Sequence, residues 1–353
     1  MATGRGNSSS NDLTRKKALK LSASAAFMTS MFGAGDTAQS TASAATSAGA
    51  ENIVGNGEEY IWGLYLSTLS YWSNAEKGMR DVGKILNVKF KRVGTTSPDA
   101  PAEVQAIQQG TSGIKVPGII ICAAEDQVLA PFINQQIARG VPVVTMDAPS
   151  FSSRALSHIG TSNVQAGLAC GQRLIKAMGG SGKVLLTRAT TISAFALREQ
   201  GFRQAVAATS GKVTIAAVIN DYDQSDKSVV SVGQALQAHP DVQGVMTLSA
   251  GAGLGTIQAL DQARKHDMHV GAFSNDRATY QLTLSHPNLF AVAQDGYKMG
   301  YFAGLFIHLA HKHLSTPNYD YRKLAISTLP PTVDTGINFV DRSNAAAFVA
   351  GAS

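Results

Sequence analysis

Residues 116–167 contain the feature that most restricts how this chain can fold. An apolar run from Gly118 to Cys122 is followed by a segment with helical spacing, which Gly140 ends, and a second apolar run stops at Asp147. This order predicts a strand–helix–strand unit, the building block of parallel sheets. Ligands of open parallel sheets bind beyond the carboxyl ends of the strands, so Asp147 is predicted to face a ligand.

The same alternation of short apolar runs and helical segments continues from residue 59 onwards and predicts an α/β chain with right-handed crossovers. About ten strands over this length favour two sheets rather than one. The predicted strands are Tyr60–Leu66, Val88–Val93, Gly118–Ile121, Val141–Thr145, Leu156–Ile159, Lys183–Thr187, Val213–Val218, Gly244–Leu248, His269–Phe273 and Leu289–Ala293. Predicted helices include Glu76–Leu86, Pro101–Gln109, Asn163–Met178, Phe195–Thr209, Ser225–His239 and Gly255–Lys265.

Residues 1–50 are typical of an export signal followed by a flexible segment. A basic stretch, Thr14 to Lys20, precedes a mildly apolar run and an Ala-Ser-Ala cleavage pattern at Ala42. The motif TRKKALK is similar to a twin-arginine signal with Lys16 in place of the second Arg, which leaves Sec and Tat export as alternatives. The protein is therefore expected to be periplasmic.

Composition excludes several classes of protein. Half of the net charge of +6 comes from residues 1–50, and no basic stripe with interleaved aromatic residues follows, so nucleic acid is not an expected partner.

The two cysteines, Cys122 and Cys170, are predicted to be separate buried thiols, although an exported protein could pair them. His308, His311 and His313 are interpreted as cations at a helix end rather than metal ligands.

Two glycine-rich segments resemble nucleotide-binding loops without meeting their requirements. The GGSGK segment at Gly179 has Ala177 and Val184 where a phosphate loop needs Gly and Ser or Thr, so it is interpreted as a turn. The glycines at 251, 253 and 255 are interpreted as a loop that enters a helix near a cleft. No nucleophile–base–acid arrangement is recognisable, so no cofactor and no enzymatic activity are predicted.

The segment VPVVTMD, followed after a short loop by SHIGTSN, resembles the periplasmic sugar-binding proteins of ABC importers, the ribose-binding-like group of the lac-repressor-type family. In that family "IPVITxD" and "SHIxxDN" carry a sugar-contacting Asp and a cleft Asn. The resemblance covers about residues 58–325. It implies an α/β fold of two doubly wound parallel-sheet lobes joined by a three-strand hinge, the periplasmic binding protein type I architecture. The N-terminal lobe would comprise 58–161 plus 295–322, and the C-terminal lobe 162–294 plus 323–353.

The resemblance also implies a set of ligand-binding residues. Asp147 and Asn163 match the cleft Asp and Asn, although Asn163 precedes a helix and could equally cap it. Tyr71 and Trp72 match the paired aromatic residues that sandwich the sugar; the loop before them is two residues shorter, and Ser70 could replace its polar contact. The remaining matches are Tyr222, Ser249, Ser274 or Asn275 (with Asp276 as a further candidate) and Gln294.

Departures from the family pattern argue against ribose itself. Ala148 replaces an Arg after the cleft Asp, Ala196 replaces a ligand-facing Arg, and Arg198 falls on a second, more structural Arg. Fewer arginines favour a hexose, a polyol or a sugar derivative and disfavour a phosphorylated ligand.

The resemblance therefore implies a monomeric solute-binding protein that closes on a sugar or polyol by hinge motion and delivers it to an ABC permease in the inner membrane. Three alternatives share parts of this interpretation. A sensor for a chemoreceptor or membrane kinase would have the same site. A lac-repressor-type regulator would need a basic helix-turn-helix before residue 58. A nucleotide-dependent enzyme would need a phosphate loop.

Overall fold

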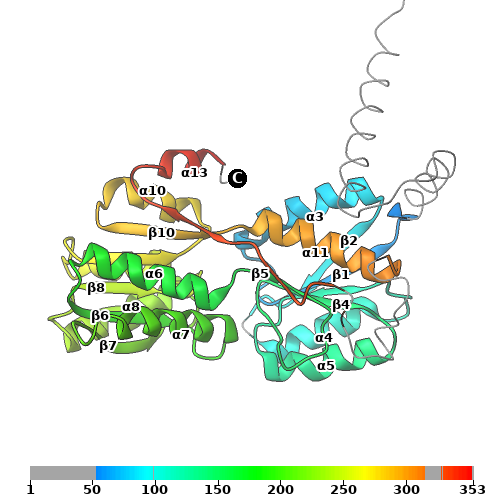
Figure 1. Cartoon of the computed structure of the whole chain (residues 1–353), viewed down its shortest axis with the longest axis horizontal. Coiled ribbons are helices and arrows are strands. Elements are labelled where there is room, and N and C mark those ends of the chain that lie inside the picture. Colours follow the sequence, from blue (N-terminus) through cyan, green and yellow to red (C-terminus); the bar gives the residue numbers. More distant parts are fainter. Residues whose placement is uncertain (1–52, 98, 315–326, 328, 352–353) are drawn as a thin grey trace, which may run out of the picture. The chain divides into compact units, whose positions relative to one another are not determined.

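The computed structural model describes residues 53–97, 99–314, 327 and 329–351, and residues 52–353 form one compact unit. The predicted export segment, 1–50, lies outside the described residues. Two six-stranded sheets form the centres of two lobes (Figure 1). All ten strands predicted from the sequence are present, with ends shifted by no more than two residues.

The first sheet has the strand order β11-β5-β4-β3-β1-β2, and all its strand pairs are parallel. Its centre, β3, is a run of three isoleucines that are all buried, as expected for a parallel strand covered on both faces. The strands are β1 (Glu59–Leu64), β2 (Lys89–Gly94), β3 (Ile119–Ile121), β4 (Val143–Met146), β5 (His158–Gly160) and β11 (Thr332–Asp334).

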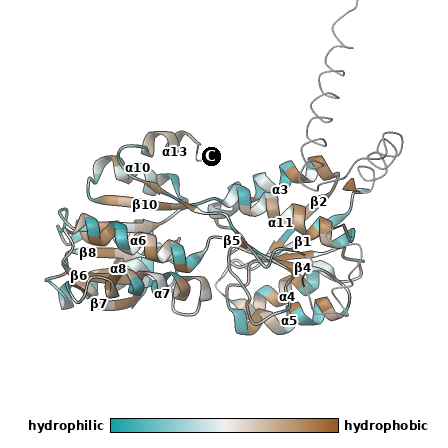
Figure 2. Cartoon of the chain, viewed as in Figure 1, coloured by the Kyte–Doolittle hydropathy of each residue, from teal (hydrophilic) through white to brown (hydrophobic). Residues whose placement is uncertain are grey.

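The second sheet has the order β12-β10-β9-β8-β6-β7, in which β12 is antiparallel to β10 and the other pairs are parallel. The middle residues of its central strands are apolar and belong to two buried clusters, one for each face of the sheet (Figure 2). The strands are β6 (Gly182–Arg188), β7 (Val213–Asn220), β8 (Gly244–Thr247), β9 (His269–Phe273), β10 (Leu289–Gln294) and β12 (Ile337–Val340).

Helices cover both faces of each sheet. In the first lobe α3 packs on α11, while α4 and α5 lie together on the opposite face (Figure 1). In the second lobe α6 packs on α7, α8 on α9, and α10 on α13. The helices are α3 (Ser73–Leu86), α4 (Ala100–Thr111), α5 (Asp126–Ala138), α6 (Asn163–Ala177), α7 (Ser193–Ala207), α8 (Ser225–Ala238), α9 (Gly253–Gln262), α10 (Arg277–Ser285), α11 (Gly296–His311) and α13 (Ala345–Gly351).

Local sequence explains several of these boundaries. Asp99 accepts a hydrogen bond from the Ala102 amide at 2.8 Å and so begins α4, with Pro101 in its first turn. Asn87 adopts a left-handed backbone, φ 54°, and ends α3. Gly179 and Gly180 have positive φ angles after α6, which confirms that the GGSGK segment is a turn into β6.

The chain passes between the lobes three times: between β5 and α6, between β10 and α11, and between β11 and β12. These passages are hydrogen-bonded to one another. The Thr335 amide donates to the Gly160 carbonyl at 2.9 Å, and the Ser162 amide donates to Asp334 Oδ1, also at 2.9 Å. The predicted assignment of 323–353 to the C-terminal lobe is therefore wrong in part, because β11 pairs with β5 in the first sheet.

Candidate functional site

A small cavity of about 40 Å³ lies where the carboxyl ends of strands from both sheets meet. Four of the predicted ligand-binding residues line it: Tyr71, Trp72, Asp147 and Gln294. The other lining residues are Tyr65, Leu69, Cys122, Ala124, Ala148, Ile192, Ala194, Phe195, Arg198, Asp223 and Ala250. The cavity is far below the 300 Å³ or so of an ordinary ligand pocket, so lobes or side chains must move for a ligand to enter.

Asp147 follows β4 directly and has a left-handed backbone with φ 68°, a conformation that Asp and Asn tolerate better than other side chains. Its Oδ1 accepts a short hydrogen bond from the Tyr71 hydroxyl, and its Oδ2 accepts a weak one from the Cys122 thiol at 3.8 Å. Burial raises the pKa of the Asp147 carboxyl, and the Tyr71 hydrogen bond opposes that shift. The carboxylate thus lies at the strand end predicted from the sequence.

The two neighbouring aromatic residues belong to a short 3-10 helix, η1 (Ser70–Trp72), rather than to an open loop. The Trp72 Nε1 donates to the Leu66 carbonyl at 3.1 Å, which holds the indole in place. The Tyr71 ring meets the Trp72 ring edge to face, with centroids 4.8 Å apart. Both rings border the cavity, so aromatic surface is available beside the Asp147 carboxylate.

Arg198 on α7 organises the second lobe's side of the cavity. Its guanidinium is buried and donates to Asn163 Oδ1 at 2.8 Å, to the Leu248 carbonyl at 2.7 Å and to Gln294 Oε1 at 2.9 Å. The guanidinium carbon also lies 4.0 Å from the centroid of the Phe273 ring. Burial lowers the pKa of Arg198. The residue is both structural, as the sequence implied, and part of the cavity wall, which the sequence analysis did not predict.

Arg198 therefore links Asn163, which does not line the cavity, to Gln294, which does. Asn163 is the first residue of α6 and Ser162 is its N-cap, and the Asn163 Oδ1 accepts from the guanidinium. Gln294 accepts from Arg198 and donates through Nε2 to Thr161 Oγ1 at 3.0 Å, which links the cavity to the first interlobe passage.

Asp223 is the carboxylate that the sequence analysis missed. Tyr222 and Asp223 both have positive φ angles, 58° and 54°, in the turn after β7. That turn leaves the Tyr222 ring exposed and brings Asp223 to the cavity, so Tyr222 does not line the site as predicted. Asp223 Oδ1 accepts from the Gly251 amide at 2.7 Å. Burial, reinforced by the Asp221 charge, raises the pKa of Asp223 to about 7, against this hydrogen bond.

The three remaining predicted residues lie outside the cavity. Ser249 is buried and donates to Asp221 Oδ1 at 2.7 Å, so it braces the turn that carries Asp223. Ser274 accepts from the Asp276 amide at 3.0 Å, and Asp276 caps α10. The Asn275 side chain bonds to the backbone of Gln294. These residues position the site instead of lining it.

The two lobes also touch directly beside the cavity. The Ser193 amide at the start of α7 donates to the Ala124 carbonyl after β3 at 3.2 Å, and the Ser193 hydroxyl reaches the same oxygen at 3.3 Å. Ile192, Ala194 and Phe195 pack into the apolar cluster of the first lobe. The cavity is therefore closed in by contacts from both lobes.

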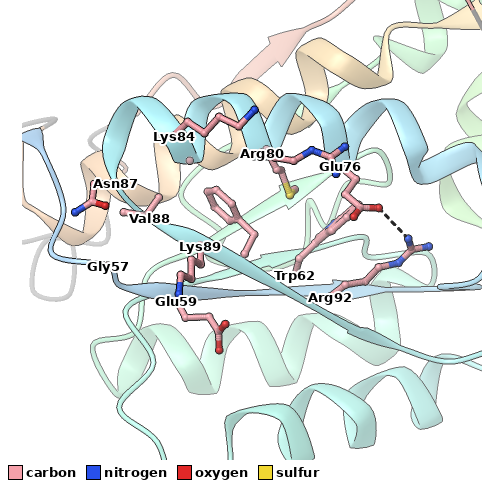
Figure 3. Close-up of a pocket in the computed structure, with 13 residues that line it drawn as sticks. Gly57, Glu59, Trp62, Glu76, Arg80, Lys84, Asn87, Val88, Lys89 and Arg92 are labelled. Atoms are coloured by element: carbon pink, nitrogen blue, oxygen red, sulfur yellow. Dashed lines mark hydrogen bonds and ion pairs between the residues drawn. The ribbon is translucent and has the colours of Figure 1, made fainter. Parts of the chain in front are cut away.

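A wider hollow of about 520 Å³ lies on the first lobe between α3 and the edge strand β2 (Figure 3). It lies along the outer edge of the first sheet and contains none of the predicted site residues. Arg92 and Glu76, which line it, form an ion pair at 3.4 Å. The basic residues Lys89, Lys91 and Arg92 along β2 suit a strand that must avoid pairing with another chain.

His308 and His311, in the last turn of α11, are not the helix-end cations predicted from the sequence. His308 is buried, with Nδ1 2.8 Å from the Tyr60 hydroxyl oxygen and Nε2 2.7 Å from the Ile53 carbonyl oxygen. Burial lowers the pKa values of His308 and His311, which favours their neutral forms. Within the described ranges no group of three or more His, Cys, Asp or Glu could hold a metal ion. Cys122 and Cys170 are buried free thiols.

Residues 64–314 match the family model described as the periplasmic binding protein domain. The ribose import binding protein RbsB of Escherichia coli strain K12 is 36% identical over 187 residues, which cover 52% of this chain and 62% of that protein. The match thus spans less than two thirds of that relative. No helix in the described part of the chain is long and apolar enough to cross a membrane.

Two solved structures share the whole architecture. AraP, an arabinose binding protein from Geobacillus stearothermophilus, superposes with a TM-score of 0.71 at 29% identity, covering 83% of this chain and 99% of that one. A sugar-binding protein of a sugar ABC transporter from Bacillus halodurans superposes with a TM-score of 0.75 at 25% identity, covering 82% and 100%.

Proposed function

Because the chain belongs to the periplasmic binding protein family, we propose that it binds a sugar or sugar-like molecule between its two lobes and releases it unchanged. The observation that carries this proposal is the composition of the cavity wall. Carboxylates from both lobes, Asp147 and Asp223, lie among aromatic rings. Carboxylates accept hydrogen bonds from hydroxyl groups, and aromatic faces pack on the apolar C–H surface of a sugar ring.

The direct contacts between the lobes support closure around the ligand. Ser193 and Ala124 bond across the cleft, and α7 packs its first turn against the first lobe. A ligand that touches Asp147 in one lobe and Arg198 in the other adds contacts that exist only when the lobes are together. Such a ligand shifts the population toward the closed form.

Delivery to an inner-membrane permease is part of the proposal, and the names of two relatives support it, one an import binding protein and the other a component of a sugar ABC transporter. The protein then acts in the periplasm as a monomer, without a nucleic-acid partner. A sensor that presents the same closed form to a membrane receptor would use an identical site. Co-purification with permease subunits, rather than with a receptor, distinguishes the two roles.

A thermal-shift screen against pentoses, hexoses, polyols and sugar acids tests the proposal. A ligand at one hundred times its dissociation constant stabilises the native state by about 2.7 kcal/mol, which is a readily measured rise in melting temperature. The Asp147→Asn variant keeps the left-handed backbone and removes the charge, so the shift should fall. Asp267→Asn, at an exposed position distant from the cavity, is the matched control. A screen in which only nucleotides or amino acids raise the melting temperature contradicts the sugar assignment.

A further inference from the structure

The charges around the cavity do not balance. Two carboxylates, Asp147 and Asp223, line it, whereas Arg198 is its one lining cation. Arg198 directs its donors to neutral acceptors, the Asn163 amide oxygen, the Leu248 carbonyl and the Gln294 amide oxygen. No ion pair involving Asp147 or Asp223 occurs among the residues that the structure describes. The guanidinium therefore offsets only one of the two negative charges, and at a distance.

Further acidic groups lie behind the wall. Asp221 is fully buried next to Asp223, where it accepts hydrogen bonds from Thr187 at 2.8 Å and from Ser249 at 2.7 Å. Glu103 on α4 is also fully buried, and neither of its carboxyl oxygens has a partner. Burial, reinforced by the charges of Asp223 and Glu125, raises the pKa of the cavity residue Tyr65. Burial also raises the pKa of Glu103 well above its usual range, so this carboxyl favours its neutral form. The turn after β7 thus places two carboxyl groups, Asp221 and Asp223, beside this part of the cleft.

The aromatic residues add to this preference. Tyr65, Tyr71, Trp72 and Phe195 border the same small cavity. The face of an aromatic ring attracts a cation, and the attraction is larger where water is excluded. Hydroxyl donors from a neutral sugar would satisfy the carboxylate oxygens but would leave the negative charge in place. An acidic sugar would add to that charge.

We propose that the cleft selects a sugar or polyol that carries a protonated amino group, with Asp147 and Asp223 as the counter-ions of that group. This inference rests on the proposed function and specifies the ligand class of the same site. The ammonium supplies the missing positive charge. Asp147 Oδ2, which accepts only a weak hydrogen bond from the Cys122 thiol, can accept from it, and so can the Asp223 carboxylate, whose Oδ1 accepts from the Gly251 amide. Charged hydrogen bonds of this kind are stronger than neutral ones, and they provide the selectivity.

The competing explanation is that a proton, rather than a ligand, neutralises the second carboxylate. The pKa of Asp223, raised to about 7, makes its protonated form accessible near neutrality. A neutral polyol would then bind as well as its amino analogue. Measurements at pH 8 separate the two explanations, because Asp223 is then mainly ionised and a primary alkylamine remains protonated, as a lysine side chain does.

The experiment compares matched ligands on the purified protein by titration calorimetry at pH 8. The pairs are 1-amino-1-deoxysorbitol with sorbitol, and each 6-amino-6-deoxyhexose with its parent hexose, because these primary alkylamines remain protonated at pH 8. We expect the amino member of at least one pair to bind about tenfold or more tightly than its neutral partner. In Asp223→Asn, which preserves the hydrogen bond from the Gly251 amide, this preference should disappear. Asp226→Asn, exposed on α8, should retain it.

The outcomes distinguish a failure of the amine selectivity from a failure of the sugar-binding proposal. Neutral members that bind as tightly as their amino partners overturn the amine selectivity and leave the sugar-binding proposal intact. An amine preference that persists in Asp223→Asn overturns the assignment of the counter-ion. If neither member of any pair binds, and the broader sugar panel is also silent, the proposed function fails together with this inference.

Discussion

Arg198 connects more parts of the site than any other side chain described above. Its three hydrogen bonds join α7 to α6, to the end of β8 and to the end of β10, and it lies against the Phe195 and Phe273 rings. The family resemblance implied its structural role, but its place in the cavity wall was not predicted, because sequence alone does not reveal which carbonyls converge on a buried guanidinium.

Replacement of Arg198 by Met should lower the free energy of unfolding by about 2–4 kcal/mol, because three buried acceptors lose their donor. Denaturant unfolding followed by circular dichroism measures this loss. Arg203→Met provides the control on the same helix, since half of the Arg203 side chain is exposed and its ion pair with Glu199 contributes about 1 kcal/mol at most. Equal losses in the two variants would contradict the role given to Arg198.

Asp223 should make the stability of the ligand-free protein depend on pH. Its pKa is raised to about 7 in the folded protein, whereas an unfolded Asp titrates near 4. The folded state therefore binds more protons between these values, and its stability falls as the pH rises from about 4 through 7. Asp147 and Asp221, whose carboxyl pKa values burial also raises, act in the same direction.

We expect Asp223→Asn to reduce the decline in melting temperature between pH 5 and pH 8. The Asp226→Asn variant, altered at an exposed position, should follow the parent protein. Differential scanning calorimetry across this range gives both curves. A decline of the same size in Asp223→Asn and the parent would show that other carboxyls control the pH dependence.

At the scale of elements, the sequence predicted the strands better than the site. Continuous apolar runs such as Ile119–Ile121 identify buried parallel strands because both of their faces are covered. The short strands β11 and β12 were not predicted, because they are partly exposed and contain polar residues.

Tyr222 was expected at the ligand and Asp223 was missed because the left-handed turn at these two residues decides which side chain faces the cavity. No local pattern in the sequence specifies that turn.

The packing of α6 against α7 depends on glycines where the helix backbones approach closely. A Cβ atom at Gly167 would lie 2.0 Å from the Arg198 carbonyl oxygen, and one at Gly201 would lie 1.9 Å from the Val164 carbonyl oxygen. An added methyl group would push α7, and with it Arg198, away from the cavity. Glycine at these two positions thus allows the close approach of α6 and α7 that places Arg198 at the cavity.

Gly167→Ala should lower the free energy of unfolding by about 1–3 kcal/mol through overpacking and should also weaken ligand binding. Gly233→Ala is the matched control, since its Cβ would meet no atom within 4 Å, and there the change should stabilise α8 by about 0.5–1 kcal/mol. Urea denaturation of both variants measures the difference. A neutral or stabilising Gly167→Ala would mean that the two helices can separate without cost.

At the scale of the whole described unit, the site and the hinge share residues. Gln294 lines the cavity, accepts from Arg198 and donates to Thr161, which lies in the passage between β5 and α6. Asp334, the last residue of β11, accepts from the Ser162 and Gly336 amides. A rotation of one lobe against the other must therefore strain or rearrange bonds that end at the ligand site. A ligand that contacts Gln294 can therefore change the angle between the lobes through the hydrogen bond from Gln294 to Thr161.

Ala194 provides a test of closure that leaves these bonds intact. It is buried at the start of α7, against the first lobe, whereas Ala196 two residues further on is exposed. A carboxylate at position 194 would be buried without a partner when the lobes touch but hydrated when they separate, so Ala194→Glu should favour the open form. Ala196→Glu adds the same charge on the solvent side and should leave the equilibrium unchanged. Ala194 also lines the cavity, so the deciding measurement is made without ligand. Small-angle X-ray scattering of the ligand-free protein should give a larger radius of gyration for Ala194→Glu than for Ala196→Glu, with unaltered circular dichroism. Identical scattering from the two variants would show that the contact at the start of α7 does not control closure.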